Sequence, residues 1–413
     1  MGLRFLTAGE SHGRALVAIV EGLPAGLPLT AGQVDHDLGR RMQGYGRGAR
    51  MKIERDRVEW LSGVRSGETL GSPVAMLIPN KDWGNWEDVM AHGGEIGEPR
   101  RRRVYRPRPG HADLVGALKY DRQDARDILE RASARETAAR VAAGALARRL
   151  LEEFDVEIGS HVLSIGGIEA AARESWPTPL NDISDRSELR VLDPAVEARM
   201  IARIDAAKKA GDTLGGEVEV VVRGLVVGLG SHVSWDRKLD GRLGAALMSI
   251  PAVKAVAVGL GLEAARRPGS EVHDAIDPEL EPGAALADAR RGGFSRRTNR
   301  AGGLEGGMTT GAPLVLRVAM KPISTLMSPL ETVHLLTGKR AQAQSERSDV
   351  TAVPALGVIA EAVTALVLAD AMLEKFGGDS LAEMRRHYQT YLDALRERWA
   401  KLGAAAPENG DEG

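Results

Sequence analysis

Two of the nine histidines lie in short glycine-bracketed motifs, and they are the residues best suited to moving protons. The first motif is Gly9-Glu10-Ser11-His12-Gly13, and the second is Arg108-Pro109-Gly110-His111-Ala112-Asp113. Glycine lets the backbone bend freely and lets another molecule approach it closely. Imidazole is the side chain that changes its charge near neutral pH. Acid–base chemistry on a small anionic ligand requires such a pair, so the sequence indicates an enzyme.

Arginine is concentrated beside these motifs and in other glycine-rich parts of the chain. The arginines concerned are Arg40, Arg41, Arg47, Arg50, those between Arg100 and Arg108, Arg131, Arg135, Arg296, Arg297, Arg300 and Arg347. A planar guanidinium binds phosphate or carboxylate through two parallel hydrogen bonds. Because the net charge of the chain is only −2, their gathering predicts a local positive pocket for a polyanionic ligand. For Arg100–Arg103 a solvated face remains an alternative.

Two further segments combine cationic, hydroxyl and acidic groups. Lys321-Pro322-Ile323-Ser324-Thr325 places a cation and two hydroxyls around a fixed proline, which suits phosphate binding. Gln344–Val350 contains Arg347, Ser348 and Asp349 directly before an apolar helix. These residues indicate catalysis or, alternatively, an N-terminal helix cap. The other seven histidines lack such neighbours and are predicted to be structural. No His-Glu-x-x-His motif or carboxylate cluster indicates a metal.

Two glycine motifs resemble sites of other enzymes. Gly9–Gly13 matches the nucleophile elbow Gly-x-Ser-x-Gly, with Ser11 as nucleophile, but an elbow requires a following helix and here a strand is expected. A hairpin turn with a polar tip is the structural alternative. Gly259–Ala264 imitates a dinucleotide-binding fingerprint after a strand. Because Arg266–Gly269 stops the helix that should follow, a simple turn is the better interpretation.

Composition excludes several functional classes. The chain has no cysteine, which excludes disulfides, thiolate zinc sites and cysteine nucleophiles, and fits a reducing cytosol. Its 55 basic and 57 acidic residues give no basic field for nucleic acid. Met1–Leu6 does not begin a signal peptide, and no run approaches the ~18 apolar residues of a membrane span. We therefore expect a soluble, intracellular protein.

Hydrophobic periodicity and capping residues predict mixed α and β elements. Strands are predicted at residues 3–6, 15–20, 58–63, 74–79, 216–229, 253–258 and 313–320. Helices are predicted at residues 31–42, 135–154, 194–210, 236–248 and 354–376, and after a cap formed by Ser380 and Glu383. Irregular loops are predicted at residues 80–110 and 266–311, and a surface insertion at 172–192. No repeat or linker divides the chain, so we predict one large α+β domain over residues 1–402 and a disordered tail over 403–413.

Taken together, the motifs occur in the order that is typical of one family. They are Gly9–Gly13, Gly44–Gly48, Arg108–Asp113, Arg131–Thr137, Gly211–Gly216, Thr298–Gly303 and the Lys321 and Arg347 segments. From about residue 3 to residue 385 the chain resembles chorismate synthase. This resemblance implies a β-α-β sandwich, usually a cytoplasmic homotetramer, that performs the last step of the shikimate pathway towards the aromatic amino acids.

The implied reaction is a 1,4-anti elimination of phosphate from 5-enolpyruvylshikimate 3-phosphate, giving chorismate, by a carbon–oxygen lyase that requires reduced FMN. Substrate and reduced FMN together carry two phosphates, two carboxylates and an anionic flavin ring. Such charges need several pairing cations before they can be desolvated, and the arginines supply them. No reductase module is visible, so NADPH would act only through an external flavin reductase. Neither nucleic acid nor a membrane is an expected partner.

The resemblance also implies roles for individual residues. His12 would assist the departing phosphate, His111 would face the reduced flavin, and Asp349 with Ser348 would lie near flavin N5. The positions that match substrate or NADP contacts are Arg41, Arg47, Arg135 and Arg300. The positions that match flavin contacts are Arg131, Ala132, Ser133, Pro251, Ala252, Gly306, Lys321, Pro322, Ile323, Ser324, Thr325 and Arg347.

One segment departs from the family pattern. Members commonly have Lys-Gly-Val-Glu-hydrophobic-Gly where this chain has Lys254-Ala255-Val256-Ala257-Val258-Gly259. The missing Gly and Glu affect the local backbone shape and one polar contact, while the catalytic set is intact. The alternatives to a chorismate synthase are a serine hydrolase that uses Ser11 and a non-catalytic protein that binds flavin or other anions.

Overall fold

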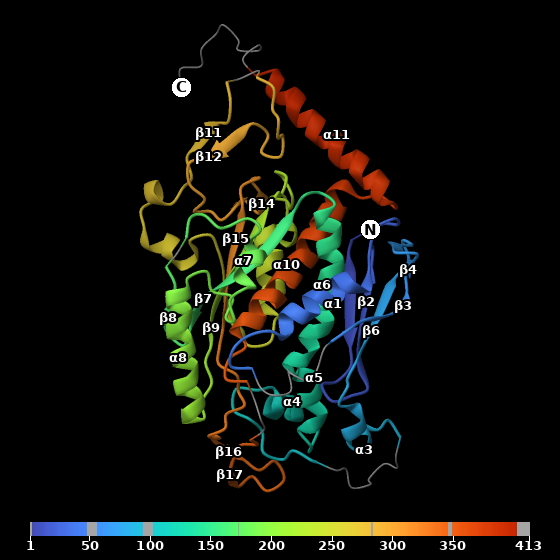
Figure 1. Cartoon of the computed structure of the whole chain (residues 1–413), viewed down its shortest axis with the longest axis vertical. Coiled ribbons are helices and arrows are strands. Elements are labelled where there is room, and N and C mark those ends of the chain that lie inside the picture. Colours follow the sequence, from blue (N-terminus) through green and yellow to red (C-terminus); the bar gives the residue numbers. More distant parts are fainter. Residues whose placement is uncertain are drawn as a thin grey trace.

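Two β-sheets enclose a layer of helices in the computed structural model, which describes residues 2–47, 56–93, 102–171, 173–281, 284–345 and 349–402 (Figure 1). The first sheet has the order β1 (Arg4–Ala8), β2 (Ala15–Glu21), β6 (Val74–Pro79) and β3 (Glu59–Ser62). The second has the order β10 (Val253–Val258), β15 (Leu314–Met320), β9 (Gly216–Arg223), β7 (Glu157–Ile165) and β8 (Ile168–Glu169). All neighbouring strands in both sheets are antiparallel.

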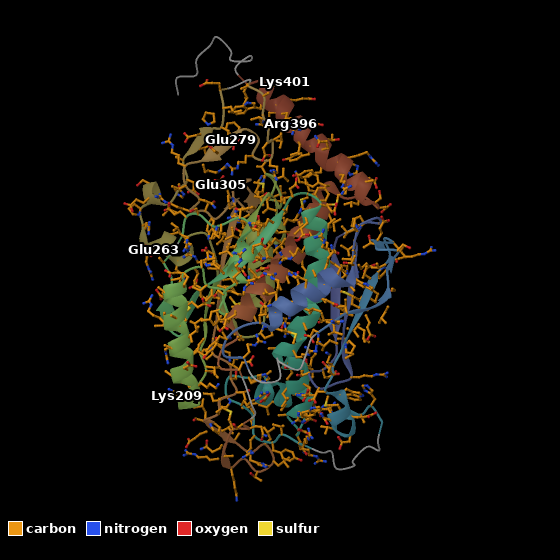
Figure 2. All side chains as sticks on the ribbon, viewed as in Figure 1. Lys209, Glu263, Glu279, Glu305, Arg396 and Lys401 are labelled. Carbon is orange, nitrogen blue, oxygen red and sulfur yellow. The ribbon has the colours of Figure 1, made fainter. Side chains whose placement is uncertain are left out.

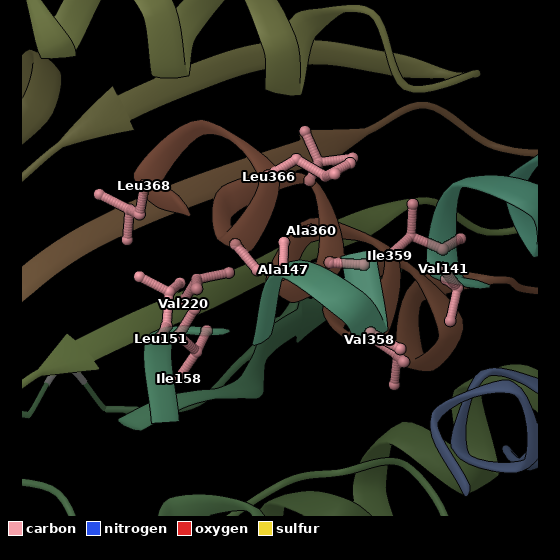
Figure 3. Close-up of a cluster of buried hydrophobic side chains, with 14 of the residues drawn as sticks. Val141, Ala147, Leu151, Ile158, Val220, Val358, Ile359, Ala360, Leu366 and Leu368 are labelled. Carbon is pink, nitrogen blue, oxygen red and sulfur yellow. The ribbon is translucent and has the colours of Figure 1, made fainter. Parts of the chain in front are cut away.

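The central layer consists of α1 (Ala31–Met42), α6 (Thr137–Glu152) and α10 (Val353–Phe376). One hydrophobic core joins both sheets to this layer. Figure 3 shows its central part, where Val141 and Ala147 of α6 lie beside Val358 and Ile359 of α10, near Val220 of the second sheet. The predicted α+β class and the β-α-β sandwich are therefore confirmed.

Helix α10 corrects one expectation from the sequence. Its 24 residues are long and apolar enough to cross a membrane, so a run of this kind does exist in the chain. However, 89% of its most apolar window is buried inside the protein. The length and composition of α10 thus suit a core helix enclosed by two sheets.

Smaller elements surround the sandwich. The short strands are β4 (Val64–Arg65), β5 (Glu68–Thr69), β11 (Ile276–Pro278), β12 (Phe294–Arg296), β13 (Leu304–Glu305), β14 (Met308–Thr309), β16 (Glu331–Val333) and β17 (Arg340–Gln342). The outer helices are α3 (Glu87–Met90), α4 (Asp113–Lys119), α5 (Arg126–Ala132), α7 (Leu180–Ser184), α8 (Pro194–Ala210), α9 (Leu239–Met248) and α11 (Leu381–Ala400). Single 3-10 turns occur at Trp83–Asn85, Ala134–Glu136, Trp235–Arg237, Gly261–Arg266 and Gly269–Glu271. Charged side chains such as Lys209, Glu263 and Arg396 project from the periphery (Figure 2).

Helix starts are the best predicted features of the fold. Thr30 and Gln33 form the expected capping box of α1, and the Asp193 side chain accepts a hydrogen bond from the Ala195 backbone N–H at 2.9 Å. The Ser380 hydroxyl accepts one from the Glu383 N–H at 3.3 Å. Caps are local, so adjacent residues suffice to predict them.

Several predicted boundaries are wrong. The strand expected at 216–229 ends at Arg223, and the helix expected from 236 begins as a 3-10 turn before Leu239. The loops predicted at 80–110 and 266–311 contain short helices or hairpins. Such two- and three-residue strands are too short to show a period in the sequence. The predicted tail, residues 403–413, lies outside the described residues.

The predicted surface insertion at 172–192 is the clearest error, because part of it belongs to the interior. Leu180 and Leu189 are buried, and so is the guanidinium of Arg190. Arg190 donates a hydrogen bond to Glu361 of α10 at 2.9 Å. The segment thus combines exposed polar residues, such as Arg173 and Glu174, with a buried ion pair that anchors it to α10.

Candidate active site

His12 lies in the loop that joins the antiparallel strands β1 and β2. Gly9 has φ +102°, and a Cβ there would lie 2.3 Å from the carbonyl oxygen of Ala15, so only glycine fits. The Asn80 side chain, at the end of β6, donates hydrogen bonds to the carbonyl oxygens of Gly13 at 2.6 Å and Glu10 at 3.2 Å. The loop that carries His12 is therefore fixed at both ends.

The imidazole of His12 is held by a carboxylate that the sequence did not predict. Its Nδ1 lies 2.9 Å from Oε2 and 3.1 Å from Oε1 of Glu130 in α5. The His12 backbone N–H also donates to Glu130 Oε2 at 2.9 Å, and the His12 ring stacks on Trp86 at 3.8 Å between centroids. Arg126, one turn before Glu130, donates to Glu130 Oε1 at 2.7 Å. The i,i+4 spacing of Arg126 and Glu130 predicts their pairing, but nothing in the sequence indicates that they face His12.

Burial acts to raise the pKa of Glu130, but its hydrogen bond and charge interaction with His12 and the charge of Arg126 outweigh this effect and lower the pKa. Glu130 is therefore ionised next to the imidazole. Arg102 and Arg126 both lie over the Trp86 ring, at 4.6 and 5.1 Å from its centroid. The result is a buried site of alternating charge with one aromatic wall.

His111, just before α4, has the same kind of support. Its Nδ1 lies 2.5 Å from Asp113 Oδ1, and Arg108 Nε donates to Asp113 Oδ2 at 2.8 Å. Arg108 Nη1 also donates to the Thr325 hydroxyl at 2.9 Å. Burial acts to raise the pKa of Asp113, yet the hydrogen bonds from His111 and Arg108 hold it far below its usual value. Each candidate histidine thus lies against an ionised carboxylate that an arginine partly neutralises.

The paired helices α4 and α5 connect the two histidine sites. His111 and Asp113 lie where α4 begins, while Arg126 and Glu130 belong to α5. A Cβ on Gly116 would lie 2.3 Å from the side chain of Ile128, so the two helices pack closely where they cross. Both lie at the lower end of the sandwich in Figure 1.

The predicted phosphate-binding segment packs directly against the His111 motif. Lys321 Nζ donates to the carbonyl oxygen of Gly110, and the Ser324 hydroxyl donates to the same oxygen at 2.9 Å. The Lys321 backbone N–H donates to the carbonyl oxygen of Ala252 at 2.9 Å, which brings a third predicted cofactor segment to this place. Burial and the nearby charge of Lys254 lower the pKa of Lys321. An ammonium in such surroundings suits an anionic ligand.

Arg47 and Asp349 form an ion pair in the wall of a large cavity. Arg47 Nε lies 2.8 Å from Asp349 Oδ2, and the Val350 N–H donates to the carbonyl oxygen of Gly46 at 2.9 Å. The cavity has a volume of about 1110 Å³, and Thr325 contributes to its wall as well. Burial lowers the pKa of the Arg47 guanidinium, and the charge of Asp349 only partly offsets this effect.

Arg41 and Arg135 converge on Asp56, a buried carboxylate that the sequence did not indicate. Arg135 Nη1 donates to Asp56 Oδ2 at 2.6 Å, and Arg41 Nη1 lies 3.8 Å from the same oxygen. Arg135 also donates twice to the side-chain oxygen of Asn80. The Asn80 side chain also holds the loop that carries His12. Arg135 is therefore linked to this loop through Asn80. Arg47 Nη1 reaches the carbonyl oxygen of Arg41 at 3.5 Å, which links the pair to the cavity.

The segment of predicted flavin contacts at residues 131–133 lies against the first motif. Arg131 donates to the carbonyl oxygens of Thr7 at 2.9 Å and Gly9 at 3.1 Å. The hydroxyls of Ser133 and Ser11 lie 3.2 Å apart, with Ser11 buried. Ala132 ends α5 between these two anchors.

Gly306 and Arg300 lie elsewhere in the fold. Gly306 turns the hairpin β13–β14, which packs against Lys238, and the adjacent Arg237 pairs with Glu374 near the C-terminal end of α10. Asp349 directly precedes the N-terminal end of that helix, about 30 Å away at 1.5 Å per residue. The Arg300 N–H donates to Asp274 at 2.9 Å, in the same part of the chain.

Three predicted positions add little to this geometry. Pro251 forms the turn between α9 and β10, next to Ala252, which has φ +70°. Arg347 and Ser348 lie outside the described residues.

Strand β10 forms despite Ala255 and Ala257, which pair with Ala319 and Arg317 of β15.

The alternatives find little support in the structure. Ser11 is followed by strand β2 and not by a helix, so the geometry of a nucleophile elbow is absent from this loop. Within the described ranges, no group of three or more His, Asp or Glu side chains could hold a metal ion. Of the histidines predicted to be structural, His161 is buried and lies 3.1 Å from Glu219.

Comparisons with known proteins agree with the motifs. The sequence pattern of the family described as chorismate synthase matches residues 3–373. The chain is 56% identical over 394 residues to the chorismate synthase of Geobacter metallireducens, covering 95% of this chain and 99% of that protein. It is 57% identical over 403 residues to that of Symbiobacterium thermophilum, covering 96% and 100%. A crystal structure of chorismate synthase superposes with a TM-score of 0.76 at 41% identity, over 96% of this chain and 99% of that one. The chain therefore belongs to the chorismate synthase family.

Proposed function

We propose that this chain catalyses the 1,4-anti elimination of phosphate from 5-enolpyruvylshikimate 3-phosphate to give chorismate, as a carbon–oxygen lyase that depends on reduced FMN. This reaction is the last step of the shikimate pathway. The observation that carries the proposal is that His12 and His111 each contact an ionised carboxylate that an arginine also binds, and that these carboxylates, Glu130 and Asp113, belong to the packed helices α5 and α4. Two oriented imidazoles among cations suit proton transfer to and from a polyanionic ligand.

The donor set fits reduced FMN. Lys321, Ser324 and Thr325 offer an ammonium and two hydroxyls beside the His111 motif, and the buried Arg47 adds a guanidinium in the cavity wall. A phosphate and an anionic ring need such groups when they leave water. Bound reduced FMN would supply the electron density that helps to expel phosphate. We assign its binding to Arg131–Ser133, Pro251, Ala252, Lys321–Thr325 and Arg347, and not to Gly306, which lies near the opposite end of α10.

The chain's own residues would bind the substrate and move protons. Arg41, Arg47 and Arg135, which lie close together, would neutralise the phosphate and carboxylates of the substrate, whereas Arg300 lies in another part of the fold. His12 would donate a proton to the departing phosphate, so that the carbon–oxygen bond breaks without leaving a trianion. His111 would hold a proton at the flavin ring, and Asp349 with Ser348 would help to remove the proton at N5.

The decisive experiment is an anaerobic assay of phosphate release with substrate and photoreduced FMN. We expect turnover with reduced FMN and none with oxidised FMN. His12→Ala, His111→Ala and Asp349→Asn should each lower kcat by ~10²-fold or more. His387→Ala on α11, an exposed residue that only contacts the end of α10, should stay within about twofold of the wild type. Turnover with oxidised flavin alone, or flavin binding without phosphate release, would contradict the proposal.

We propose that NADPH does not reduce the flavin on this chain. NADPH should therefore support turnover only after an external flavin reductase is added. The absence of cysteine supports a reducing, cytoplasmic location.

We also propose a homotetramer. The outer face of the first sheet exposes apolar side chains, with Leu6 66%, Leu61 58% and Ile19 38% accessible. Exposed apolar side chains on one sheet face are typical of a protein–protein interface. Sedimentation equilibrium should give four copies per particle, and a monomer at assay concentration would exclude this assembly.

A further inference from the structure

We infer that Glu130 is a positioning residue of the reaction: its carboxylate fixes the imidazole of His12 with the proton on Nδ1, so that Nε2 exchanges the proton with the departing phosphate. This inference rests on the proposed function, in which His12 is the proton donor. It adds Glu130, which the sequence motifs do not contain and which lies in α5, 118 positions after His12.

The contacts of Glu130 are concentrated on His12. Both carboxylate oxygens lie within 3.1 Å of Nδ1, and Oε2 also accepts the backbone N–H of His12 at 2.9 Å. An ionised carboxylate accepts hydrogen bonds but donates none. Nδ1 must therefore carry a proton in this contact, whether the ring is neutral or charged. A hydrogen bond to one ring nitrogen sets the protonation of the other.

Three neighbours keep the carboxylate and the ring in place. Arg126, one turn earlier in the same helix α5, donates to Glu130 Oε1 at 2.7 Å. Trp86 covers the imidazole face at 3.8 Å. The Ser11 N–H donates to the carbonyl oxygen of Glu130 at 2.9 Å, which ties the two backbones together. The side chain of Glu130 is only 2% exposed, and that of His12 is 14% exposed.

The proton balance follows from these contacts. The charged ring would transfer its Nε2 proton to a phosphate oxygen as the carbon–oxygen bond breaks and the bonding pair leaves with phosphate. The neutral ring then retains Nδ1–H in its hydrogen bond to Glu130. Glu130 itself takes up no proton, because His12 and Arg126 lower its pKa despite burial. It therefore orients the donor without taking part in the proton transfer itself.

Glu130→Gln is the direct test, because glutamine keeps the size of the side chain and removes its charge. An amide nitrogen turned towards His12 would donate to Nδ1 and so move the ring proton to Nε2. Histidine-selective ¹⁵N spectra of the flavin-free protein should show a protonated Nδ1 for His12 in the wild type and a protonated Nε2 in the variant. The His12 signals are identified by their loss in His12→Asn. Unchanged spectra would overturn the inference.

Kinetics provide the second readout. An orienting carboxylate beside a catalytic imidazole contributes up to about 10⁴-fold in kcat, and we expect Glu130→Gln to lower kcat at least ~10-fold, with KM within about threefold. Glu130→Asp, which restores the charge, should recover part of kcat. A Glu130→Gln kcat within twofold of an active wild type would overturn the inference.

Glu219 offers a matched control, because it is equally buried and contacts His161 and Arg317 at 3.1 Å each, on the second sheet. Glu219→Gln should preserve kcat even if it lowers thermal stability, which separates a loss of buried charge from a loss of orientation. If the wild type itself releases no phosphate with reduced FMN, the proposed function fails. The ¹⁵N spectra still decide the role of Glu130 towards His12.

Discussion

Glu361→Gln should destabilise the protein strongly, because Glu361 is the centre of a buried ionic cluster. The side chain lies in the middle of α10 with no solvent exposure. It accepts hydrogen bonds from six side-chain nitrogens and oxygens that belong to four other parts of the fold. The donors are Arg40 in α1, Arg148 in α6, Ser160 in β7, and Asn181 and Arg190 in the segment that precedes α8.

The expected magnitude follows from the charges that remain. Arg40 retains Asp37 and Asp185, and Arg148 retains Asp37. Three guanidinium groups, each at most 12% exposed, would then share two carboxylates. Removing one partner of a buried ion pair costs about 3–5 kcal/mol in the free energy of unfolding. With an unfolding entropy of roughly 0.9 kcal/mol/K for a chain of 413 residues, Tm should fall by about 3–6 °C.

Chemical denaturation followed by circular dichroism measures this difference, and Thr364→Val is the matched control. Thr364 lies one turn further along α10 and is equally buried, but its hydroxyl has no hydrogen-bond partner among the described residues. Thr364→Val should be neutral or slightly stabilising. A loss below about 1 kcal/mol for Glu361→Gln would show that the cluster does not depend on its central charge.

The ionic cluster around Glu361 predicts that the stability of the folded protein depends on pH. Burial acts to raise the pKa of Glu361, but Arg40, Arg148 and Arg190 outweigh it and hold the pKa far below the ordinary 4.5. A carboxylate with a lowered pKa in the folded state stabilises the protein above its ordinary pKa, and this contribution is lost as the pH falls. The stability difference between wild type and Glu361→Gln should thus be constant above about pH 5.5 and shrink below 4.5. A constant difference down to pH 3 would refute the electrostatic origin.

Two further predictions concern packing and the second histidine. Gly144→Ala places a Cβ 2.5 Å from the Cβ of Ala362, so α6 and α10 must separate, and we expect a loss of about 1–3 kcal/mol in denaturant titrations. Gly84→Ala, with open space around it, serves as the control, and equal stability of the two variants would exclude this close contact. Asp113→Asn should lower kcat at least ~10-fold in the phosphate-release assay, because an amide cannot accept from both His111 and Arg108. The pKa of Asp113 is held far below 3.8, so the wild-type pair should persist to the acid limit of the assay, and a normal kcat in Asp113→Asn would contradict its role.

Sequence periodicity was sufficient for the main elements because they are long and amphipathic or apolar, whereas their arrangement as a sandwich was predicted from the family resemblance. The strands at 15–21 and 74–79 alternate between buried and less buried residues, and the helix at 353–376 is predominantly apolar. Caps at Thr30, Asp193 and Ser380 then fixed where helices start. Local residues determine all of these features, so a single sequence shows them.

The candidate site was only partly predictable, because its charges are paired across long distances in the chain. The motifs showed His12, His111 and several arginines, which lie in unusual glycine-rich contexts. They did not show Glu130, Asp56 or Glu361, which lie in ordinary helical or loop sequence. A carboxylate becomes a counter-ion only when the fold brings it to a buried cation, and no spacing rule encodes that encounter.

The arginines show what the composition alone could predict about the site and what it could not. Their number predicted a positive pocket, but the structure pairs many of them with carboxylates of the chain itself. Arg40, Arg148 and Arg190 neutralise Glu361 inside the sandwich. Arg41 and Arg135 share Asp56, and Arg47 pairs with Asp349 in the wall of the cavity. A guanidinium that already has a buried carboxylate partner contributes less positive potential to a ligand. Substrate binding should therefore depend less on the total number of arginines near the site than on those that line the cavity, such as Arg47.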